Sequence, residues 1–358
     1  MTAAEVVADP IGQLNLMLWM TLPLPGEYRL RPLLNEAGYR LFAIAPPMPL
    51  APGLRERVQT KGLPCREQPE PDLLLVAEED REFLMLECKR TMFGPDSSSA
   101  DQARGLLLQT GGQFNVAVGL PIAASTITHL VYIAEHCDSP NPAEGLLAIS
   151  HQLERAGFRV APAGVVCLQA RGEDIWLLDG YEPGEIPQRL HERINGEAKV
   201  QEAVEGEEAM PILLVPWDPN VDQASPVAQH GRRVLCDRLL TSLVVRIGRL
   251  PAGQEVEVEF DELLNEANSN LYERWAARNR ETRSSLRRFC SKILHEALGD
   301  GTGVKVDSLQ GGAGLRITVP GELEREAAID GITKCTRKAC PEIPSPDPQG
   351  VLFEDEEL

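Results

Sequence analysis

Two carboxylates and a lysine stand at the ends of one short stretch of the sequence, residues 71–90, which reads PDLLLVAEEDREFLMLECKR. Asp72 opens this stretch, and Glu87 and Lys89 close it. Two carboxylates held close together repel each other and offer an oxygen-rich site to a hard divalent cation such as Mg²⁺. A neighbouring lysine can orient or help to deprotonate an attacking water and can stabilise negative charge on a phosphate. These residue types therefore point to metal-dependent phosphate chemistry.

The elements that would bring these side chains together are two strands joined by a polar turn. Residues 72–77 and 83–89 are apolar runs on either side of a charged segment, which predicts a β-hairpin. Side chains alternate along a strand, so Glu87 and Lys89 share one face, and pairing across the turn places Asp72 beside them. The alternative is a surface hairpin whose lysine and edge glutamate are only solvated.

The pattern resembles the motif of the PD-(D/E)xK nuclease superfamily, which is met here by Pro71-Asp72 and then by Glu87-Cys88-Lys89. The resemblance implies an α/β fold of the restriction-endonuclease-like type, a central mixed sheet flanked by helices. It also implies hydrolysis of phosphodiester bonds with Mg²⁺ or Mn²⁺. In that reading Asp72 and Glu87 bind the metal, and Lys89 assists the nucleophile.

The same resemblance suggests three further site residues. Glu36, near the end of a helix predicted for residues 29–38, is the candidate for an additional acidic metal ligand. A second helix is predicted for residues 100–108, where Gln102 is a candidate catalytic residue and Arg104 a candidate contact to the nucleic-acid phosphate. Surface solvation explains the helical glutamate equally well, and a half-exposed amphipathic helix explains the other two.

The order of elements in residues 1–190 is irregular. Besides the hairpin, strands are predicted at 39–45 and 129–135, a helix at 143–157, and a closing hairpin around Arg171-Gly172. This order is compatible with a restriction-endonuclease-like core. A regular nucleotide-binding fold fits less well, because no GxGxxG or GKS/T loop follows a strand, so an ATPase is not expected in this chain.

A second domain is predicted at residues 226–322. A helix, an alternating strand at 254–260, two further helices and a glycine-rich hairpin follow one another in this segment. This order resembles a small winged helix-turn-helix domain. The resemblance rests on the order of the elements, because no sequence motif accompanies it.

The helix predicted for residues 280–298 is strongly basic. Arginines spaced three and four residues apart share one helical face, which can lie against phosphates or in a major groove. A solvated face and a protein-docking surface are the alternatives. The candidate nucleic-acid contacts are Arg280, Arg283, Arg287, Arg288 and Lys292 on this helix, and Lys305 and Arg316 on the following hairpin.

Composition adds bounds on charge and location. The 358 residues carry a formal net charge of −19, but much of the acid lies in a predicted linker at 191–225 and a proline-rich tail at 323–358. Nucleic-acid binding is therefore not excluded, because the distribution of charge matters more than its sum. The eight cysteines form no CxxC pair, which favours reduced thiols over disulfides or zinc. We expect a cytoplasmic protein, because no apolar stretch is long enough to span a membrane and no basic flank indicates a signal peptide.

Together these features predict a metal-dependent nuclease, with DNA as the expected substrate. By analogy, bacterial restriction and antiviral (phage) defence systems are the expected setting. The expected partners are DNA and either a second copy of the chain or a partner protein such as an ATPase or helicase subunit. Two alternatives stay open: a nuclease-like scaffold without catalysis, and a DNA-binding regulator that reads DNA through the winged helix.

Overall fold

The chain divides into two compact units in a computed structural model of the protein. One unit comprises Met1–Gln229 and Leu271–Arg283, and the other comprises His230–Asn270 and Ser284–Leu358. Within them the structure describes residues 1–23, 29–77, 81–90, 93–95, 97–122, 125–136, 143–179, 185–203, 213–219, 225–251, 253–275, 279–299 and 302–339.

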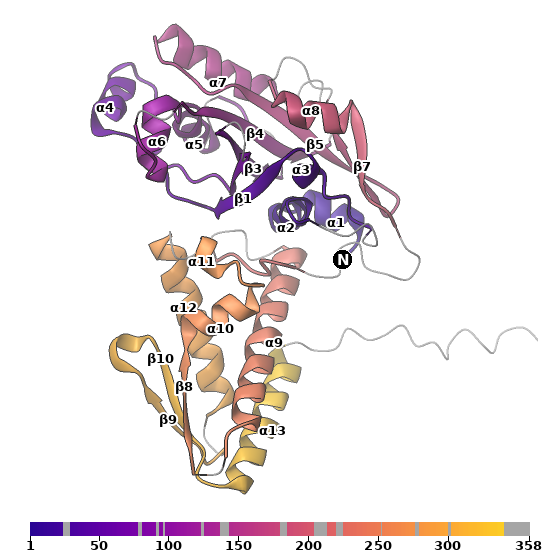
Figure 1. Ribbon diagram of the computed structural model, residues 1–358, viewed down its shortest axis with the longest axis vertical. Coiled ribbons are helices and arrows are strands. Elements are labelled where there is room, and N and C mark those ends of the chain that lie inside the picture. The colour runs from indigo at the N-terminus through magenta and orange to yellow at the C-terminus, as the bar shows by residue number, and fades with distance from the viewer. Residues whose placement is uncertain are drawn as a thin grey trace, which may run out of the picture. The chain divides into compact units, whose positions relative to one another are not determined.

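A seven-stranded mixed sheet forms the centre of the first unit (Figure 1). The strands lie in chain order, β3, β4 and β5 are parallel, and all other neighbouring pairs are antiparallel. The predicted α/β fold with a mixed sheet is thereby confirmed. The strands are β1 (Tyr39–Ile44), β2 (Leu73–Ala77), β3 (Glu82–Lys89), β4 (Ile127–Glu135), β5 (Ala163–Arg171), β6 (Asp174–Leu178) and β7 (Glu197–Gln201).

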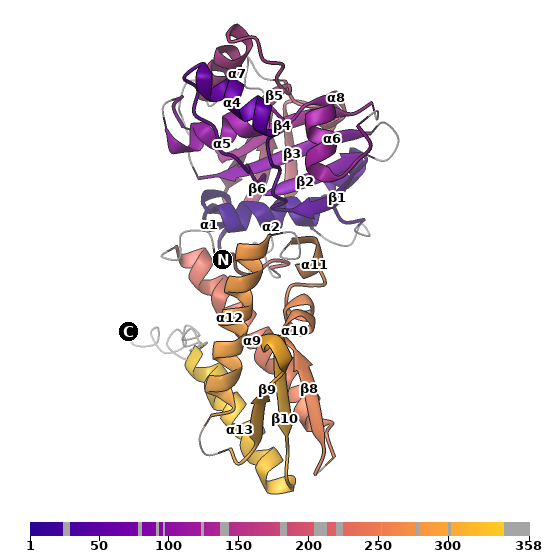
Figure 2. The same ribbon diagram turned by 90° about the vertical axis from the view of Figure 1, so that its left-hand side faces the viewer.

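Helices cover both faces of this sheet (Figure 2). On one face α1 (Ala3–Ala8) and α2 (Pro10–Met20) pack against the central strands, and α5 (Ser98–Leu107), α6 (Gly111–Val118) and α7 (Glu144–Arg155) pack on the other. The predicted flanking helices are therefore present. Further helices of this unit are α3 (Leu33–Glu36), α4 (Pro52–Thr60), α8 (Gln188–Ile194) and α11 (Tyr272–Trp275).

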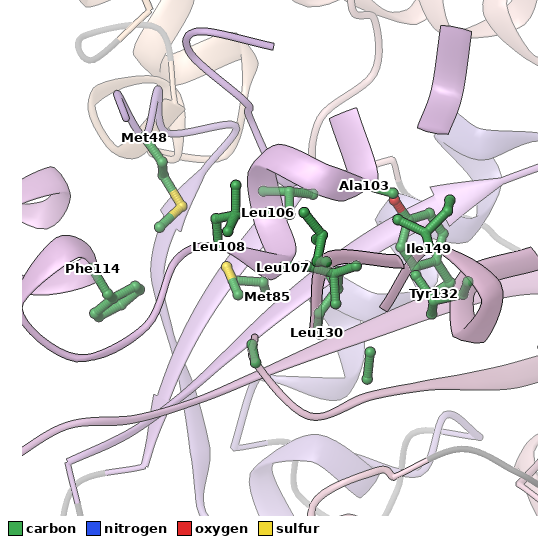
Figure 3. Close-up of a cluster of buried hydrophobic side chains, with 14 of the residues drawn as sticks. Met48, Met85, Ala103, Leu106, Leu107, Leu108, Phe114, Leu130, Tyr132 and Ile149 are labelled. Atoms are coloured by element: carbon green, nitrogen blue, oxygen red, sulfur yellow. The ribbon is translucent and has the colours of Figure 1, made fainter. Parts of the chain in front are cut away.

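An apolar layer fills the space between the sheet and α5, α6 and α7 (Figure 3). Met85 of β3 and Leu130 of β4 face Leu106 of α5 and Ile149 of α7, and all four side chains are fully buried. Burying an aliphatic side chain of this size stabilises a fold by about 1.5–3 kcal/mol. This layer fixes the position of α5 over β3, and both elements contribute to the candidate site.

The last strand of the sheet lies inside the segment that the sequence assigns to an acidic linker, 191–225. β7 pairs with β6 and buries Ala198 and Val200, with polar residues between them. This alternation is only five residues long and stands among charged residues, which hides it in the sequence. The linker is therefore shorter than predicted.

The apolar segment that follows, residues 213–217, docks on α2. The side chain of Asn15 donates to the Val215 carbonyl at 2.8 Å and accepts from the Val215 N–H at 2.9 Å. Leu213 and Trp217 are buried on either side. The sequence leaves open whether this segment meets the protein itself or a partner, and the structure places it on the first unit.

The second unit contains a three-stranded antiparallel sheet in the order β8–β10–β9 (Figure 2). One face of this sheet is buried, through Val258, Leu315 and Ile317. Its strands are β8 (Glu255–Glu259), β9 (Lys305–Ser308) and β10 (Gly314–Thr318), and its helices are α9 (Pro226–Gly248), α10 (Phe260–Ala267), α12 (Arg280–Ala297) and α13 (Glu322–Ala339).

The predicted order of helix, strand, helix, helix and hairpin is present, but two boundaries differ from the prediction. Leu271–Arg283, which includes α11, groups with the first unit, so residues 226–322 do not form one separate domain. The predicted tail at 323–358 begins as α13, where Ala328 and Ile332 are buried, and residues 340–358 lie outside the described ranges. No helix in the described ranges is long and apolar enough to cross a membrane.

Candidate functional site

The sheet register brings Asp72, Glu87 and Lys89 to one place. Leu73 of β2 pairs with Leu86 of β3, so Asp72, just before β2, lies beside Glu87 near the end of β3. Because side chains alternate, Glu87 and Lys89 follow Met85 on the face that α5 covers. The candidate site is therefore the polar end of the apolar layer shown in Figure 3.

Glu87 is the buried centre of this cluster, with 1% of its side chain exposed. Its Oε1 accepts from Lys89 Nζ at 2.7 Å and from Gln102 Nε2 at 2.5 Å. Its Oε2 has no hydrogen-bond partner among the described residues. A buried carboxylate oxygen without a hydrogen-bond donor is costly, so a cation bound beside it would be stabilising.

Asp72 and Lys89 connect the buried glutamate with solvent. Asp72 is half-buried, and its Oδ2 accepts from the backbone N–H of Cys88 at 2.6 Å. Lys89 keeps 25% of its side chain exposed while its ammonium contacts Glu87. These two residues therefore form the partly exposed side of the cluster.

The electrostatics of the cluster favour an additional positive charge. Burial, and then the charge of Asp72, raise the pKa of Glu87 to about 8, although Lys89 opposes both effects. Burial also raises the pKa of Asp72. Burial lowers the pKa of Lys89, but the charges of Glu87 and Asp72 outweigh this effect and raise it overall. Two neighbouring carboxylates share one cationic side chain here, and a bound cation would relieve the remaining repulsion between them.

Gln102 of α5 belongs to the cluster, in the position that the sequence argument gives it. Its side chain is buried, and Nε2 donates to Glu87 Oε1 and, at 3.0 Å, to the carbonyl oxygen of Glu70. Its Oε1 accepts from Arg66 Nη1 at 2.5 Å. All of these bonds together fix the orientation of the amide.

Arg104 does not face the site, in contrast to the prediction. Residues two apart on a helix point about 200° from each other, so Arg104 faces away from the side of α5 that carries Gln102. The Arg104 guanidinium is buried and donates to the carbonyls of Pro64 at 3.1 Å and Pro95 at 2.6 Å. It also pairs with Asp101 at 2.9 Å. Arg104 thus holds two loops against α5 and is not available to a phosphate.

Glu36 is likewise not brought to the cluster. The predicted helix is only four residues long, and it ends before Gly38, whose φ of 84° turns the chain into β1. β1 begins at Tyr39 opposite Ala77, at the end of β2 away from the site. The Glu36 carboxylate pairs there with Arg31 at 2.8 Å. The structure therefore does not bring Glu36 to Asp72 and Glu87, and its assignment as a metal ligand gains no support from the fold.

Three residues beside the cluster are missing from the sequence argument. Gln13 of α2 is fully buried and donates to the Lys89 carbonyl at 3.1 Å, and a polar residue within an apolar helical run is a signal that could have revealed it. Tyr132 of β4 pairs in register with Glu87, and its buried hydroxyl has no partner among the described residues. Arg66 lies in the loop between α4 and β2, and no sequence pattern predicts that this loop passes beside the cluster.

The basic helix α12 presents a different face from the predicted one. Arg287 forms two hydrogen bonds with the carboxylate of Asp261 in α10, at 2.6 and 2.5 Å, so its charge is neutralised. Arg283 is half-buried. The basic residues that α12 exposes to solvent are spaced by four or eight positions: Arg280, Arg288 and Lys292.

A cation from α9 extends this exposed basic surface. The guanidinium of Arg232 lies 5.3 Å from the ring centre of Phe289, which sits on α12 between Arg288 and Lys292. Arg232 is exposed, and neither it nor Arg288 pairs with a carboxylate in the described ranges. We call Arg232, Arg288 and Lys292 the α9–α12 basic surface. Lys292 also lies 3.7 Å from Glu296, which weakens its contribution.

The β9–β10 hairpin does not extend this basic surface. Arg316 pairs with Glu257 at 2.5 Å and lies 3.7 Å from Glu255, while Lys305 is exposed. The open face of the sheet also carries the carboxylates of Glu259 and Asp307. Acidic groups outnumber basic groups on this face, so the hairpin is poorly suited to contact phosphates.

Within the described ranges, no group of three or more His, Cys, Asp or Glu side chains is placed to hold a metal ion. The acidic side chains of the cluster are the pair Asp72 and Glu87. Comparisons with protein-family models, with curated proteins and with solved structures find no match.

Proposed function

We propose that this protein is a metal-dependent nuclease that hydrolyses phosphodiester bonds of DNA at Asp72, Glu87 and Lys89. The observation that carries this proposal is the state of Glu87, whose Oε1 is held by Lys89 and Gln102 while its buried Oε2 has no hydrogen-bond partner among the described residues. A structural ion pair would need only the first oxygen. The resemblance to the PD-(D/E)xK pattern points to the same residues.

The donor set fits Mg²⁺ or Mn²⁺. Mg²⁺ prefers oxygen ligands and is commonly held by one or two carboxylates, with waters and substrate phosphate oxygens completing the shell. Asp72 and Glu87 would hold the ion, and no third acidic side chain is required. When bound, the ion would polarise the phosphate and lower the pKa of the attacking water.

The residues of the chain supply the remaining chemistry. The raised pKa of Lys89 keeps its ammonium charged, so it can orient the water and stabilise charge that develops on the phosphate. Gln102 holds Glu87 in one orientation, and Gln13 anchors the backbone of Lys89 from the opposite face of the sheet. Pre-positioned groups of this kind lower a barrier without reorganisation during the reaction.

DNA binding is proposed for the α9–α12 basic surface. The second unit has the element order of a winged helix and a three-stranded antiparallel sheet, which supports that assignment. Phosphates would contact Arg232, Arg288 and Lys292, and the neutralised Arg287 would not take part. A single site cuts one strand, so a double-strand break would need a second copy of the chain or a second cleavage reaction by the same copy. Bacterial restriction or phage defence, with a separate ATPase or helicase, is the proposed setting.

A non-catalytic scaffold is the second candidate. The described residues place no third acidic side chain beside Asp72 and Glu87. The open sheet face of the second unit is acidic, which suits a protein partner better than DNA. In that case the chain would keep the fold of the site and bind other proteins.

A cleavage assay separates the two candidates. Wild type, Asp72→Asn and Lys89→Ala would be incubated with plasmid and single-stranded DNA in Mg²⁺ or Mn²⁺. Lys61→Ala, which removes an exposed cation that forms no ion pair among the described residues, is the control. We expect metal-dependent cleavage that falls by about 10²–10⁴-fold in both site variants and is unchanged in the control. Cleavage that survives both site substitutions would contradict the site, and an inert wild type would favour the scaffold.

A further inference from the structure

We propose that Arg66 forms a phosphate-binding subsite at the rim of the Asp72–Glu87–Lys89 cluster, for a phosphodiester group of the DNA backbone. This inference rests on the proposed nuclease function and gives Arg66 the role that the sequence argument assigns to Arg104. Arg66 also acts as a positioning residue, because it orients the amide of Gln102.

The first observation is the place of Arg66. Its backbone N–H donates to the carbonyl of Asp101 at 3.0 Å, which ties the loop before β2 to α5. Its Nη1 donates to Gln102 Oε1 at 2.5 Å, and Gln102 in turn contacts Glu87. One hydrogen-bonded side chain therefore separates the guanidinium from the buried carboxylate of the cluster.

The second observation is that most of the side-chain N–H donors of Arg66 form no hydrogen bond within the described ranges. The residue is exposed, and within the described ranges it forms no ion pair with a carboxylate. A guanidinium has five N–H donors in a planar fork that matches two oxygens of a phosphate. Only one side-chain bond is formed here, so the outward edge of the fork is open for a bidentate phosphate contact.

The third observation is that an acidic residue near Arg66, Glu70, has a partner of its own. The Glu70 carboxylate accepts from Asn279 Nδ2 at 2.8 Å, so it is held by another residue.

Two other cations near the cluster are engaged by protein groups. Lys89 contacts Glu87, and Arg104 is buried between Pro64 and Pro95. Arg66, in contrast, is exposed, and its only side-chain hydrogen bond within the described ranges is the one to Gln102.

The bond to Gln102 gives Arg66 its second effect. With Oε1 facing Arg66, both N–H groups of Gln102 are directed at Glu87 and at the Glu70 carbonyl. Without Arg66, Gln102 Oε1 loses its donor, and the amide is held only through its N–H groups, so its orientation is less firmly fixed. Loss of Arg66 should therefore weaken DNA binding and also slow the chemical step.

The test measures DNA binding and DNA cleavage in parallel on the full chain. Fluorescent single-stranded DNA would be titrated in EDTA at several salt concentrations, and cleavage would be followed with Mg²⁺ to obtain kcat and KM. The variants are Arg66→Ala and Arg66→Lys, with Lys61→Ala as a charge-matched control from the same loop. Arg66→Lys keeps the charge and serves as the informative variant if Arg66→Ala does not fold.

For Arg66→Ala we expect an affinity loss of about tenfold to hundredfold, as for a lost charge-assisted hydrogen bond. The slope of log affinity against log salt should fall by about 0.7, the value for one phosphate contact on a single strand. A merely structural role would not change this slope. Arg66→Lys should keep the slope and recover part of the affinity, and its kcat should stay below that of wild type because the Gln102 bond is altered.

If Arg66→Ala binds DNA with the affinity and the salt slope of wild type, the subsite proposal is overturned, even if wild type cleaves DNA. Equal losses in Lys61→Ala would also overturn it, because the effect would then be one of net charge. If binding depends on Arg66 while wild type does not cleave, the subsite stands and the nuclease proposal fails. Absence of DNA binding by wild type would overturn both.

Discussion

Gln102 and Glu87 are joined by a hydrogen bond of 2.5 Å between Nε2 and Oε1. One partner comes from α5 and the other from β3, so the apolar layer that holds the helix on the sheet also sets this distance. Hydrogen bonds to ionised groups are stronger than neutral ones. The bond therefore fixes which oxygen of Glu87 has hydrogen-bond donors and which has none among the described residues, and the proposed cation site depends on that difference.

DNA binding should depend on α12 and not on the β9–β10 hairpin. Replacing Arg288 and Lys292 by Gln should weaken binding to duplex DNA and lower the salt slope by about 0.9 for each lost phosphate contact. The matched control replaces Lys305 and Arg316 by Gln, which removes the same charge from the acidic sheet face. A salt titration of DNA affinity measures both. An equal loss of DNA affinity in the hairpin variant would show that the β9–β10 hairpin also contacts DNA.

The segment around Val215 should contribute to the stability of the first unit through Asn15. Asn15→Leu removes both hydrogen bonds to Val215, together with one to the Ile11 carbonyl, and leaves the buried N–H and carbonyl of Val215 unpaired, so we expect a loss of about 2–4 kcal/mol in the free energy of unfolding. Urea unfolding, with hydrogen exchange at the Val215 amide, measures this loss.

Asn35→Leu is the control for that variant. Asn35 is only half-buried and reaches the Thr21 carbonyl at 3.4 Å, so the loss should stay below about 1 kcal/mol. Slow exchange at Val215 in Asn15→Leu would show that the segment is held by other contacts.

His129 should make the first unit less stable in acid. Burial lowers the pKa of His129 below the ordinary 6.5, although Glu82 and Glu185 oppose this effect. The imidazole lies 3.9 Å from Glu82, whose carboxylate also pairs with Arg189. Because the folded pKa lies below the unfolded one, this contribution is fully present above pH 6.5 and is lost as the pH falls through the folded pKa.

Urea unfolding of wild type and His129→Gln at about pH 8 and about pH 5 measures this effect. The carboxylates titrate in both proteins over this pH range. The difference between the stability losses of wild type and His129→Gln therefore isolates the contribution of His129. We expect wild type to lose more stability on acidification than His129→Gln. An equal or smaller loss in wild type would show that protonated His129 is tolerated beside Glu82.

Local patterns in the sequence are sufficient to predict the centre of the site. Two apolar runs around a polar turn predict β2 and β3, and strand alternation then places Glu87 and Lys89 on one face next to Asp72. Gln102 also follows from its helix. The predicted placement of these side chains agrees with the structure because it depends on a period of two or on neighbours close in the chain.

Features that depend on long-range packing are not available from the sequence. The four-residue α3 enters β1 at the end of the sheet away from Asp72, which separates Glu36 from the site. Helical spacing groups Arg287 with Arg280 and Arg283, but packing of α12 against α10 gives Arg287 a carboxylate partner in Asp261. The approach of Arg66 likewise depends on the path of a loop. The assignment of the second unit as a winged helix stays a prediction.

The central claim is that Asp72 and Glu87 together hold a divalent cation. Equilibrium binding of Mn²⁺ to the DNA-free protein, with Mg²⁺ as competitor, tests it most directly. Wild type should bind Mn²⁺, Asp72→Asn and Glu87→Gln should each lose that binding, and Asp174→Asn should retain it because Asp174 pairs with Lys199 elsewhere on the sheet. Mn²⁺ binding that is equal in wild type, Asp72→Asn and Glu87→Gln would contradict the claim.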